Sequence, residues 1–241
     1  MRALIGAIAW IGAVSFLAFT TPAWSQDKNM VIYGIQLEEL EYRWGDEDED
    51  VMVWNGDAFL GTDEAKIRWM SEGEYDLDTK TFESLENRLV VQFPISTFFD
   101  AKAGVRWDAP KGPDRWYGNL GVTGLAPQWF EIDADLFVSE NGDTSARLDA
   151  EYELLLTNRL ILTPSADINV AFTEDREIGI GSGVSSVEAG LRLSYDVIDR
   201  RLSPYIGVVY ERKLGNTADF ANEEGEDVEG WRIVVGTKFK F

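Results

Sequence analysis

Residues 144–156 of the chain read Thr-Ser-Ala-Arg-Leu-Asp-Ala-Glu-Tyr-Glu-Leu-Leu-Leu. From Ala146 to Leu156 every second side chain is apolar, and charged side chains fill the positions between Ala146 and Leu154. This alternation predicts a β-strand with one apolar and one charged face, because successive side chains of a strand point to opposite sides. Residues 130–138 and 187–197 repeat the pattern.

The length of these runs helps to distinguish strands of a soluble protein from strands that cross a membrane. They extend over roughly ten residues, whereas strands of soluble proteins centre on about five or six and membrane-crossing strands need about 9–11. A long strand with one charged face has two soluble arrangements, a sandwich or a lipocalin-like barrel. It has one membrane arrangement, in which the apolar face contacts lipid and the charged face lines an enclosed interior.

The spacing of the turns favours the membrane arrangement. The alternation predicts about twelve strands, and the connections between them alternate in character. Tight connections are expected at 61–63, 95–97, 126–127, 157–159 and 199–201, and the other set includes long ones at 109–114, 173–183 and 215–227. Short turns on one rim and longer loops on the other are typical of outer-membrane barrels. The sequence therefore predicts an all-β fold, an antiparallel transmembrane β-barrel with both termini on the short-turn side.

The amino-terminal segment resembles a secretory leader. Arg2 precedes an apolar run to about Phe19, and small residues stand at Ala23 and Ser25. This pattern predicts a signal peptide over residues 1–25, with an uncleaved membrane anchor as the alternative. We then expect a short periplasmic tail over 26–34 and the barrel over 35–241, in the outer membrane of a Gram-negative bacterium.

The last strand carries a signal for membrane assembly. Every second residue from Trp231 to Phe241 shares one face, and the chain ends on an aromatic side chain. This end is similar to the carboxy-terminal signal read by the outer-membrane assembly machinery, which we expect as a partner during biogenesis. Aromatic residues at both ends of the expected strands suit interfacial girdles against outer-membrane lipid. They are Trp69, Tyr75, Trp107, Trp116, Tyr195, Tyr210, Trp231 and Phe241.

Composition excludes several classes of function. The chain has 241 residues with 22 Lys and Arg against 43 Asp and Glu, a formal net charge of −21, and neither His nor Cys. Such an acidic chain repels nucleic acid. Without His or Cys it has no imidazole for a triad and no thiolate for catalysis or metal binding. Ser182 stands between glycines but has no imidazole partner, so we expect no enzymatic activity.

The charged strand faces predict an interior that carries both signs, with Arg88, Arg147 and Glu151 among its side chains. Two interpretations stay open at this point. The charges can form a salt-bridged filling that makes the barrel rigid. Alternatively, uncompensated carboxylates can line a narrow path that prefers cations.

Two acidic clusters lie outside the strand pattern. The first comprises Asp46, Glu47, Asp48, Glu49 and Asp50, and the second comprises Glu223, Glu224, Glu226 and Asp227. Barrel closure pairs the first strand with the last, so both clusters are expected on one stretch of the outer rim. Carboxylate oxygens favour hard ions such as calcium or magnesium, and Cu²⁺ competes because it heads the divalent affinity order. The alternative is a solvated charge run, or a structural rim that contacts lipopolysaccharide through divalent cations.

Several stretches resemble the copper resistance protein B (CopB) family of outer-membrane proteins. They include Trp54-Asn55-Gly56-Asp57, Ala103-Gly104-Val105-Arg106-Trp107-Asp108, and residues 124–131, 151–162, 179–183, 204–208 and 225–227. The resemblance covers most of residues 35–241. It implies an outer-membrane β-barrel that contributes to copper tolerance by binding or handling copper ions.

The chain departs from this family before the barrel. In many members, the segment before the barrel looks rich in Met and His, which suit copper. Residues 26–34 here hold one Met and no His. Met70 is predicted on the interior face beside Glu72 and Glu74, where it is the one soft ligand available to copper. Its alternative role is that of a packed interior side chain.

Overall fold

The computed structural model describes residues 30–45, 50–109 and 113–241, and almost all of them lie in long strands. The strands are β1 (Ile32–Trp44), β2 (Asp50–Gly61), β3 (Lys66–Asp76), β4 (Thr81–Pro94), β5 (Phe99–Ala109), β6 (Arg115–Ala126), β7 (Phe130–Ser139), β8 (Thr144–Glu151), β9 (Leu154–Leu155), β10 (Leu160–Ala171), β11 (Gly183–Tyr195), β12 (Leu202–Lys213) and β13 (Glu229–Lys240). The helical elements are η1 (Pro127–Trp129), η2 (Arg176–Ile178) and α1 (Gly215–Glu224). β1 begins three residues before the expected barrel boundary at residue 35.

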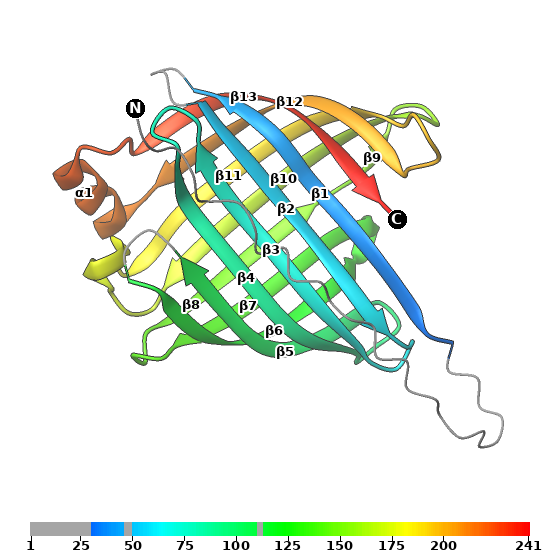
Figure 1. Ribbon diagram of the computed structural model, residues 1–241, viewed down its shortest axis with the longest axis horizontal. Coiled ribbons are helices and arrows are strands. Elements are labelled where there is room, and N and C mark those ends of the chain that lie inside the picture. Colours follow the sequence, from blue (N-terminus) through cyan, green and yellow to red (C-terminus); the bar gives the residue numbers. More distant parts are fainter. Residues whose placement is uncertain (1–29, 46–49, 110–112) are drawn as a thin grey trace, which may run out of the picture.

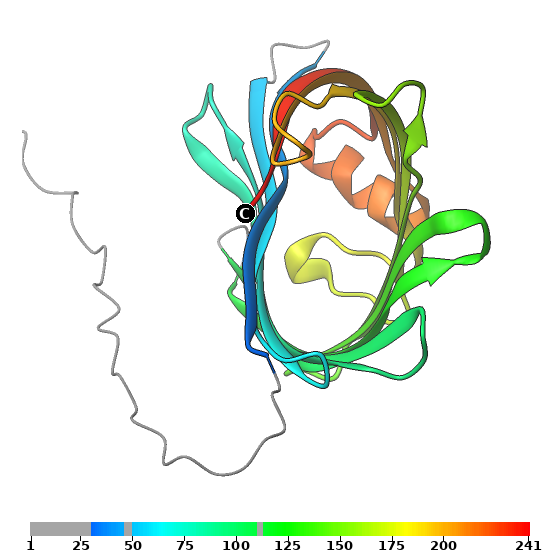
Figure 2. The ribbon, with the colours of Figure 1, turned by 90° about the vertical axis from the view of Figure 1, so that its right-hand side faces the viewer.

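The strands form one closed antiparallel barrel (Figure 1). Consecutive strands pair with one another, and β1 closes the sheet by pairing with β13. β8 and β9 both pair with β10 and form one interrupted strand, so the wall has twelve strands. The predicted fold class is thereby confirmed. Seen from its end, the barrel has an elongated cross-section (Figure 2).

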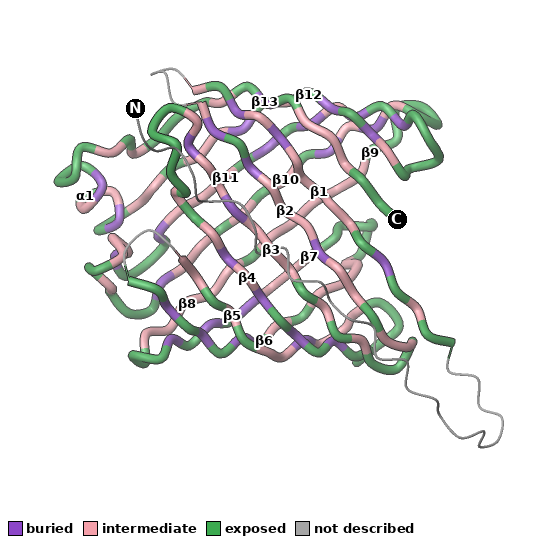
Figure 3. Tube along the Cα trace, viewed as in Figure 1, coloured by how far each residue is buried: buried purple, intermediate pink, exposed green. Residues whose placement is uncertain are grey.

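Burial alternates along many of the strands, and the buried face is the polar one, the opposite of a soluble protein (Figure 3). On β4, Arg88 and Gln92 are buried, whereas Leu89 and Val91 are exposed. The charged faces therefore point inward, as predicted. A small apolar cluster of Tyr205, Val209 and Val234 is also buried, but polar side chains make up most of the buried interior.

The two rims differ in their connections. The end of β13 and the start of β1 lie on the rim with the short turns, which we call the periplasmic rim. The other end, the outer rim, carries the long connections at 172–182 and 214–228. α1 occupies the second of these and is an addition to the predicted architecture. None of the helices in the described ranges is long and apolar enough to span a membrane.

Outward aromatic pairs follow the outer rim. Tyr42 with Trp44, Tyr75 with Phe82, Trp107 with Trp116, and Tyr210 with Trp231 have ring centroids 4.4, 5.0, 6.0 and 4.9 Å apart. Each pair sits at a strand end next to an outer-rim connection. Aromatic rings at this height suit a membrane interface, where an apolar ring and a polar edge are both accommodated.

Candidate functional site in the barrel interior

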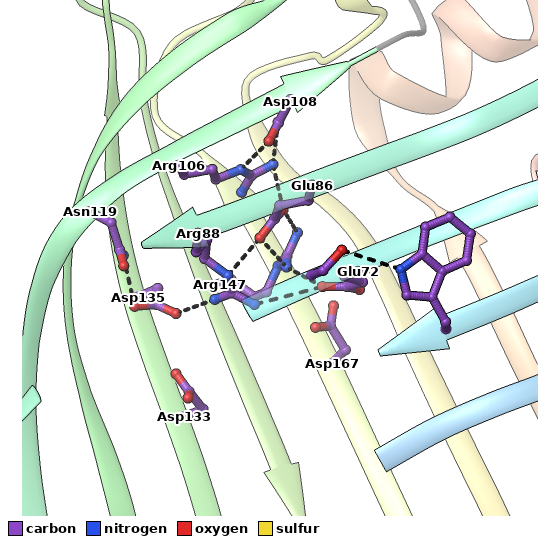
Figure 4. Close-up of polar contacts among 12 residues, drawn as sticks. Glu72, Glu86, Arg88, Arg106, Asp108, Asn119, Asp133, Asp135, Arg147 and Asp167 are labelled. Carbon is purple, nitrogen blue, oxygen red and sulfur yellow. Dashed lines mark hydrogen bonds and ion pairs between the residues drawn. The ribbon is translucent and has the colours of Figure 1, made fainter. Parts of the chain in front are cut away.

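A network of ion pairs crosses the middle of the barrel and is centred on Glu86 of β4 (Figure 4). Its carboxylate lies 2.8 Å from Arg88 Nε, 2.8 Å from Arg106 Nη2 and 3.1 Å from Arg147 Nη2. Glu86 and Arg88 are both buried. An isolated carboxylate at such a position would be very costly, and three guanidinium groups compensate for its desolvation.

Arg147 carries this network across the interior. It projects from β8, and its guanidinium donates to Glu72 of β3 at 3.1 Å and to Glu86 at 3.1 and 3.3 Å. Its Nε also donates to Asn169 Oδ1 of β10 at 3.1 Å. Because β8 is not a neighbour of β3 or β4 in the sheet, Arg147 bridges two opposite walls of the barrel.

Asp135 of β7 continues the network toward β5 and β6. It accepts hydrogen bonds from Arg88 Nη1 at 2.7 Å, Lys102 Nζ at 2.8 Å and Asn119 Nδ2 at 2.8 Å. Lys102 also binds Asp133. All hydrogen bonds here involve at least one charged group, which makes them stronger than neutral ones. In this part of the interior, the charged side chains fill the space and compensate one another.

A second buried network joins the two ends of the sheet. Glu41 of β1 accepts hydrogen bonds from Arg43 Nε at 2.7 Å and from Tyr205 Oη at 2.8 Å. Arg192 of β11 donates two more, at 3.0 and 2.9 Å. Arg43 in turn donates to Glu188 of β11 at 3.0 Å. The chain therefore crosslinks β1 to β11 inside the barrel, in addition to the backbone pairing of β1 with β13.

Between these networks lies a cavity of about 600 Å³, which we call the inner cavity. Twelve carboxylates line it, against six arginine or lysine side chains. Met70, Glu72 and Glu74 all belong to its lining. The excess of carboxylates makes this cavity attractive to cations and repellent to anions.

A second cavity, the rim cavity, has a volume of about 410 Å³ and lies at the outer rim. Gly45, directly before the first acidic cluster, lines it together with Glu226 and Asp227 of the second cluster. Glu74 lines both the rim cavity and the inner cavity. Among the described residues, Glu74 Oε1 has no hydrogen-bond partner, and Arg232 Nη1 lies 3.7 Å from it.

The structure places the remaining predicted metal residues as follows. Asp46, Glu47, Asp48 and Glu49 lie outside the described residues. Asp50 begins β2 and accepts a hydrogen bond from Tyr42. Glu226 binds Lys213 Nζ at 2.9 Å, and Glu223 and Glu224 end α1. Within the described part of the chain, no three carboxylates are arranged to hold one metal ion, so the rim site stays a prediction.

Sequence reasoning overlooked the interior residues of β1, namely Glu39, Glu41 and Arg43. The reason is a register irregularity between Leu37 and Glu41, which interrupts the two-residue alternation. Two neighbouring residues, Glu38 and Glu39, consequently both line the inner cavity. The remaining signal was the charge itself, because carboxylates in a membrane strand have to face the interior.

A barrel of twelve long antiparallel strands, with an apolar exterior and a charged interior, defines a transmembrane β-barrel of the outer-membrane type. The chain belongs to the copper resistance protein B (CopB) family, whose model, described as "Copper resistance protein B precursor (CopB)", matches residues 31–241. The predictions of family, fold and outer-membrane location are confirmed.

Known relatives and structures agree with this assignment. The chain is 37% identical over 199 residues to the Copper resistance protein B homolog of Pseudomonas syringae pv. tomato, covering 82% of this chain and 67% of that protein. It is 37% identical over 209 residues to Copper resistance protein B of Escherichia coli, covering 87% of this chain and 69% of that protein. The NanC porin structure superimposes with a TM-score of 0.54 and 11% identity, covering 87% of this chain and 100% of that one. The NanC likeness shows the fold alone.

Proposed function

We propose that this barrel contributes to copper resistance by binding or handling copper ions. The observation that carries the proposal is membership of the copper resistance protein B family along residues 31–241. The surroundings of Glu74 add support, since this carboxylate lines both the rim cavity and the inner cavity that contains Met70.

The residue types present suit two copper oxidation states in different places. Carboxylates of the two acidic clusters are hard ligands that accept Cu²⁺, and also calcium or magnesium. The Met70 thioether is a soft ligand that suits Cu⁺, and Glu72 and Glu74 lie two and four residues farther along the same strand face. Copper that arrives at the rim would then meet a carboxylate at each step toward Met70.

Growth on graded copper tests the contribution to resistance. A strain that lacks the gene should be more sensitive to copper, and the wild-type gene should restore tolerance. A variant with Asp46–Asp50 and Glu223–Asp227 neutralised to Asn and Gln should restore tolerance only in part. The matched control is Asp63→Asn with Glu64→Gln, which neutralises exposed carboxylates on the periplasmic rim. Unchanged copper tolerance after deletion would refute the proposal.

Metal titration of the purified barrel tests binding itself. Cu²⁺ should bind saturably and in preference to calcium, and neutralising the two clusters should weaken it. Met70→Leu keeps the side-chain volume and removes the sulfur, so it should weaken Cu⁺ binding while leaving Cu²⁺ binding unchanged. Equal and weak binding of copper and calcium would mean that the rim is a solvated acidic surface.

A further inference from the structure

Three cavities lie in the barrel, two of them at the outer rim and one farther inside. The helix-side cavity, of about 480 Å³, lies beneath α1 and η2 at the outer rim, and Thr217, Phe220 and Glu224 line it. The inner cavity continues toward the periplasmic rim, where Lys240 and Glu131 line it. Glu211 of β12 lines these two cavities and the rim cavity as well. The three spaces therefore meet at one level of the interior.

Two arginines lie at the level where the outer spaces meet the inner one. Arg147 lines both the helix-side cavity and the inner cavity, and it bridges β8 to Glu72 of β3. From the other side, Arg232 of β13 lies 3.7 Å from Glu74 of β3 and donates to Glu211 at 3.2 Å. Carboxylates of β3 thus pair with Arg147 of β8 and with Arg232 of β13 (Figure 4 shows the Arg147 side).

We propose that Arg147 and Arg232 form the constriction of a cation-selective path through the barrel. The side chains at this level are held by ion pairs, and the cavities on both sides already have room for several water molecules. Glu211, which faces all three cavities, marks the point where the path passes the arginines. Removal of the two guanidinium groups joins the cavities and leaves their excess negative charge in place.

A row of carboxylates on one wall sets the preference for cations. Asp133 of β7 lies opposite Asp149 of β8, Asp149 opposite Asp167 of β10, Asp167 opposite Glu188 of β11, and Glu188 opposite Glu211. All five residues line the inner cavity. Like charges directly opposite on neighbouring strands repel one another, so this wall favours a mobile cation nearby.

The middle of the row is the least compensated part. Asp133 binds Lys102, Glu188 binds Arg43 and Glu211 binds Arg232. Asp149 and Asp167 form no ion pair with a lysine or arginine within residues 30–45, 50–109 and 113–241. Asp167 accepts a hydrogen bond from the neutral Asn169 Nδ2 at 2.6 Å. The two side chains also hydrogen-bond to each other, so this pair is held without an ion pair to a fixed cation.

Conductance of the full-length purified protein in planar lipid bilayers tests the constriction. Arg147→Ser and Arg232→Ser should each raise the single-channel conductance in KCl, and the double variant should raise it several-fold above wild type. Arg212→Ser removes the same charge from an exposed position beside Glu229 and should leave the conductance unchanged. Heat-dependent migration in gels verifies that each variant is folded. A folded double variant that conducts no more than wild type overturns the proposal, and so does an equal rise with Arg212→Ser.

Reversal potentials under a KCl gradient test the selectivity of the same double variant. It should prefer potassium to chloride, and adding Asp149→Asn and Asp167→Asn should lower that preference several-fold. Asp199→Asn is the matched control, because Asp199 is exposed on the periplasmic rim with φ 41°, a conformation that Asn also tolerates. A preference for chloride, or an unchanged preference after the two Asn substitutions, contradicts the assignment.

Copper binding and ion permeation are separate properties of this barrel. The rim clusters and Met70 stay intact in every variant of the conductance series. If deletion of the gene lowers copper tolerance while the double variant does not conduct, only the copper function is supported. If the double variant conducts while the purified barrel binds no copper, only the path is supported.

Discussion

Arg192 of β11 donates two hydrogen bonds, of 3.0 and 2.9 Å, to Glu41 of β1 inside the barrel. Glu41 is only 2% exposed and also accepts from Arg43 and Tyr205. The pair lies next to the junction of the first and last strands, where it adds a side-chain link to the backbone pairing of β1 with β13. Its removal should therefore weaken the closure of the sheet as well as local packing.

Glu41→Ala should destabilise the folded barrel by about 3–5 kcal/mol, because it leaves two buried guanidinium groups without their main partner. Tyr205→Phe removes a single hydrogen bond and should cost about 1–2 kcal/mol. Urea unfolding in detergent micelles, followed by tryptophan fluorescence, measures both effects. Arg200→Gln is the control, since its bond of 3.1 Å to Glu153 is exposed and such pairs contribute about 0–1 kcal/mol. A cost for Glu41→Ala no larger than that control would show that the network does not stabilise the seam.

The apolar exterior predicts that a charged substitution on it lowers the free energy of unfolding. The size of this loss should depend on how deep the position lies in the membrane. Leu120 is 62% exposed in the middle of β6, where arginine should cost about 2–4 kcal/mol. Leu60 is 58% exposed near the periplasmic end of β2, where the same substitution should cost about 0–1 kcal/mol. Folding into lipid vesicles at graded urea concentrations compares Leu120→Arg with Leu60→Arg. Equal costs at both positions would contradict a membrane-facing exterior.

Much of this fold follows from the period of the sequence. Alternation over long runs predicts the strands, their inward faces and their number, because a one-residue shift would expose every charge to lipid. The irregularity in β1 hides Glu41, the centre of one interior network, since the residues around it do not alternate. Cross-barrel pairs such as Arg147 with Glu72 are 75 residues apart in sequence and depend on the elongated cross-section, which the pattern of one strand does not specify.

Helix α1, in the last outer-rim connection, shows another kind of structure that the local sequence does not predict. Residues 215–224 have no apolar stripe, and the sequence predicts a long connection there. Tertiary contacts hold the helix in place: Thr217 Oγ1 accepts a hydrogen bond from the Gly181 backbone N–H at 2.9 Å. Arg176 lies over the Phe220 ring at 4.5 Å from its centroid. Since these contacts join two loops, neither loop sequence alone indicates them.

Gly181→Ala should therefore detach α1 from its neighbouring loop. A Cβ at Gly181 would lie 2.3 Å from Asn216 Cβ and 2.6 Å from the Thr217 backbone N, so the helix has to move. Limited proteolysis of intact cells should cleave this variant within residues 214–228 faster than wild type. Gly230→Ala is the control, because a Cβ there meets no atom within 4 Å. Equal protection of Gly181→Ala and wild type would mean that the loops adjust without releasing the helix.

Substitution of Phe241 should separate the stability of the folded barrel from its assembly in the outer membrane. Phe241 exchanges two backbone hydrogen bonds with Ile35, of 2.9 and 3.0 Å, while its ring is 76% exposed. Phe241→Ala keeps both bonds and loses only the exposed ring, so the purified variant should unfold within about 0.5 kcal/mol of wild type. If the ring is the feature read by the assembly machinery, the amount of folded barrel in the outer membrane should fall several-fold in cells. Phe98→Ala removes another exposed ring, in a periplasmic turn, and should leave that amount unchanged. Equal outer-membrane levels for wild type and Phe241→Ala would show that the Phe241 ring is not part of the assembly signal.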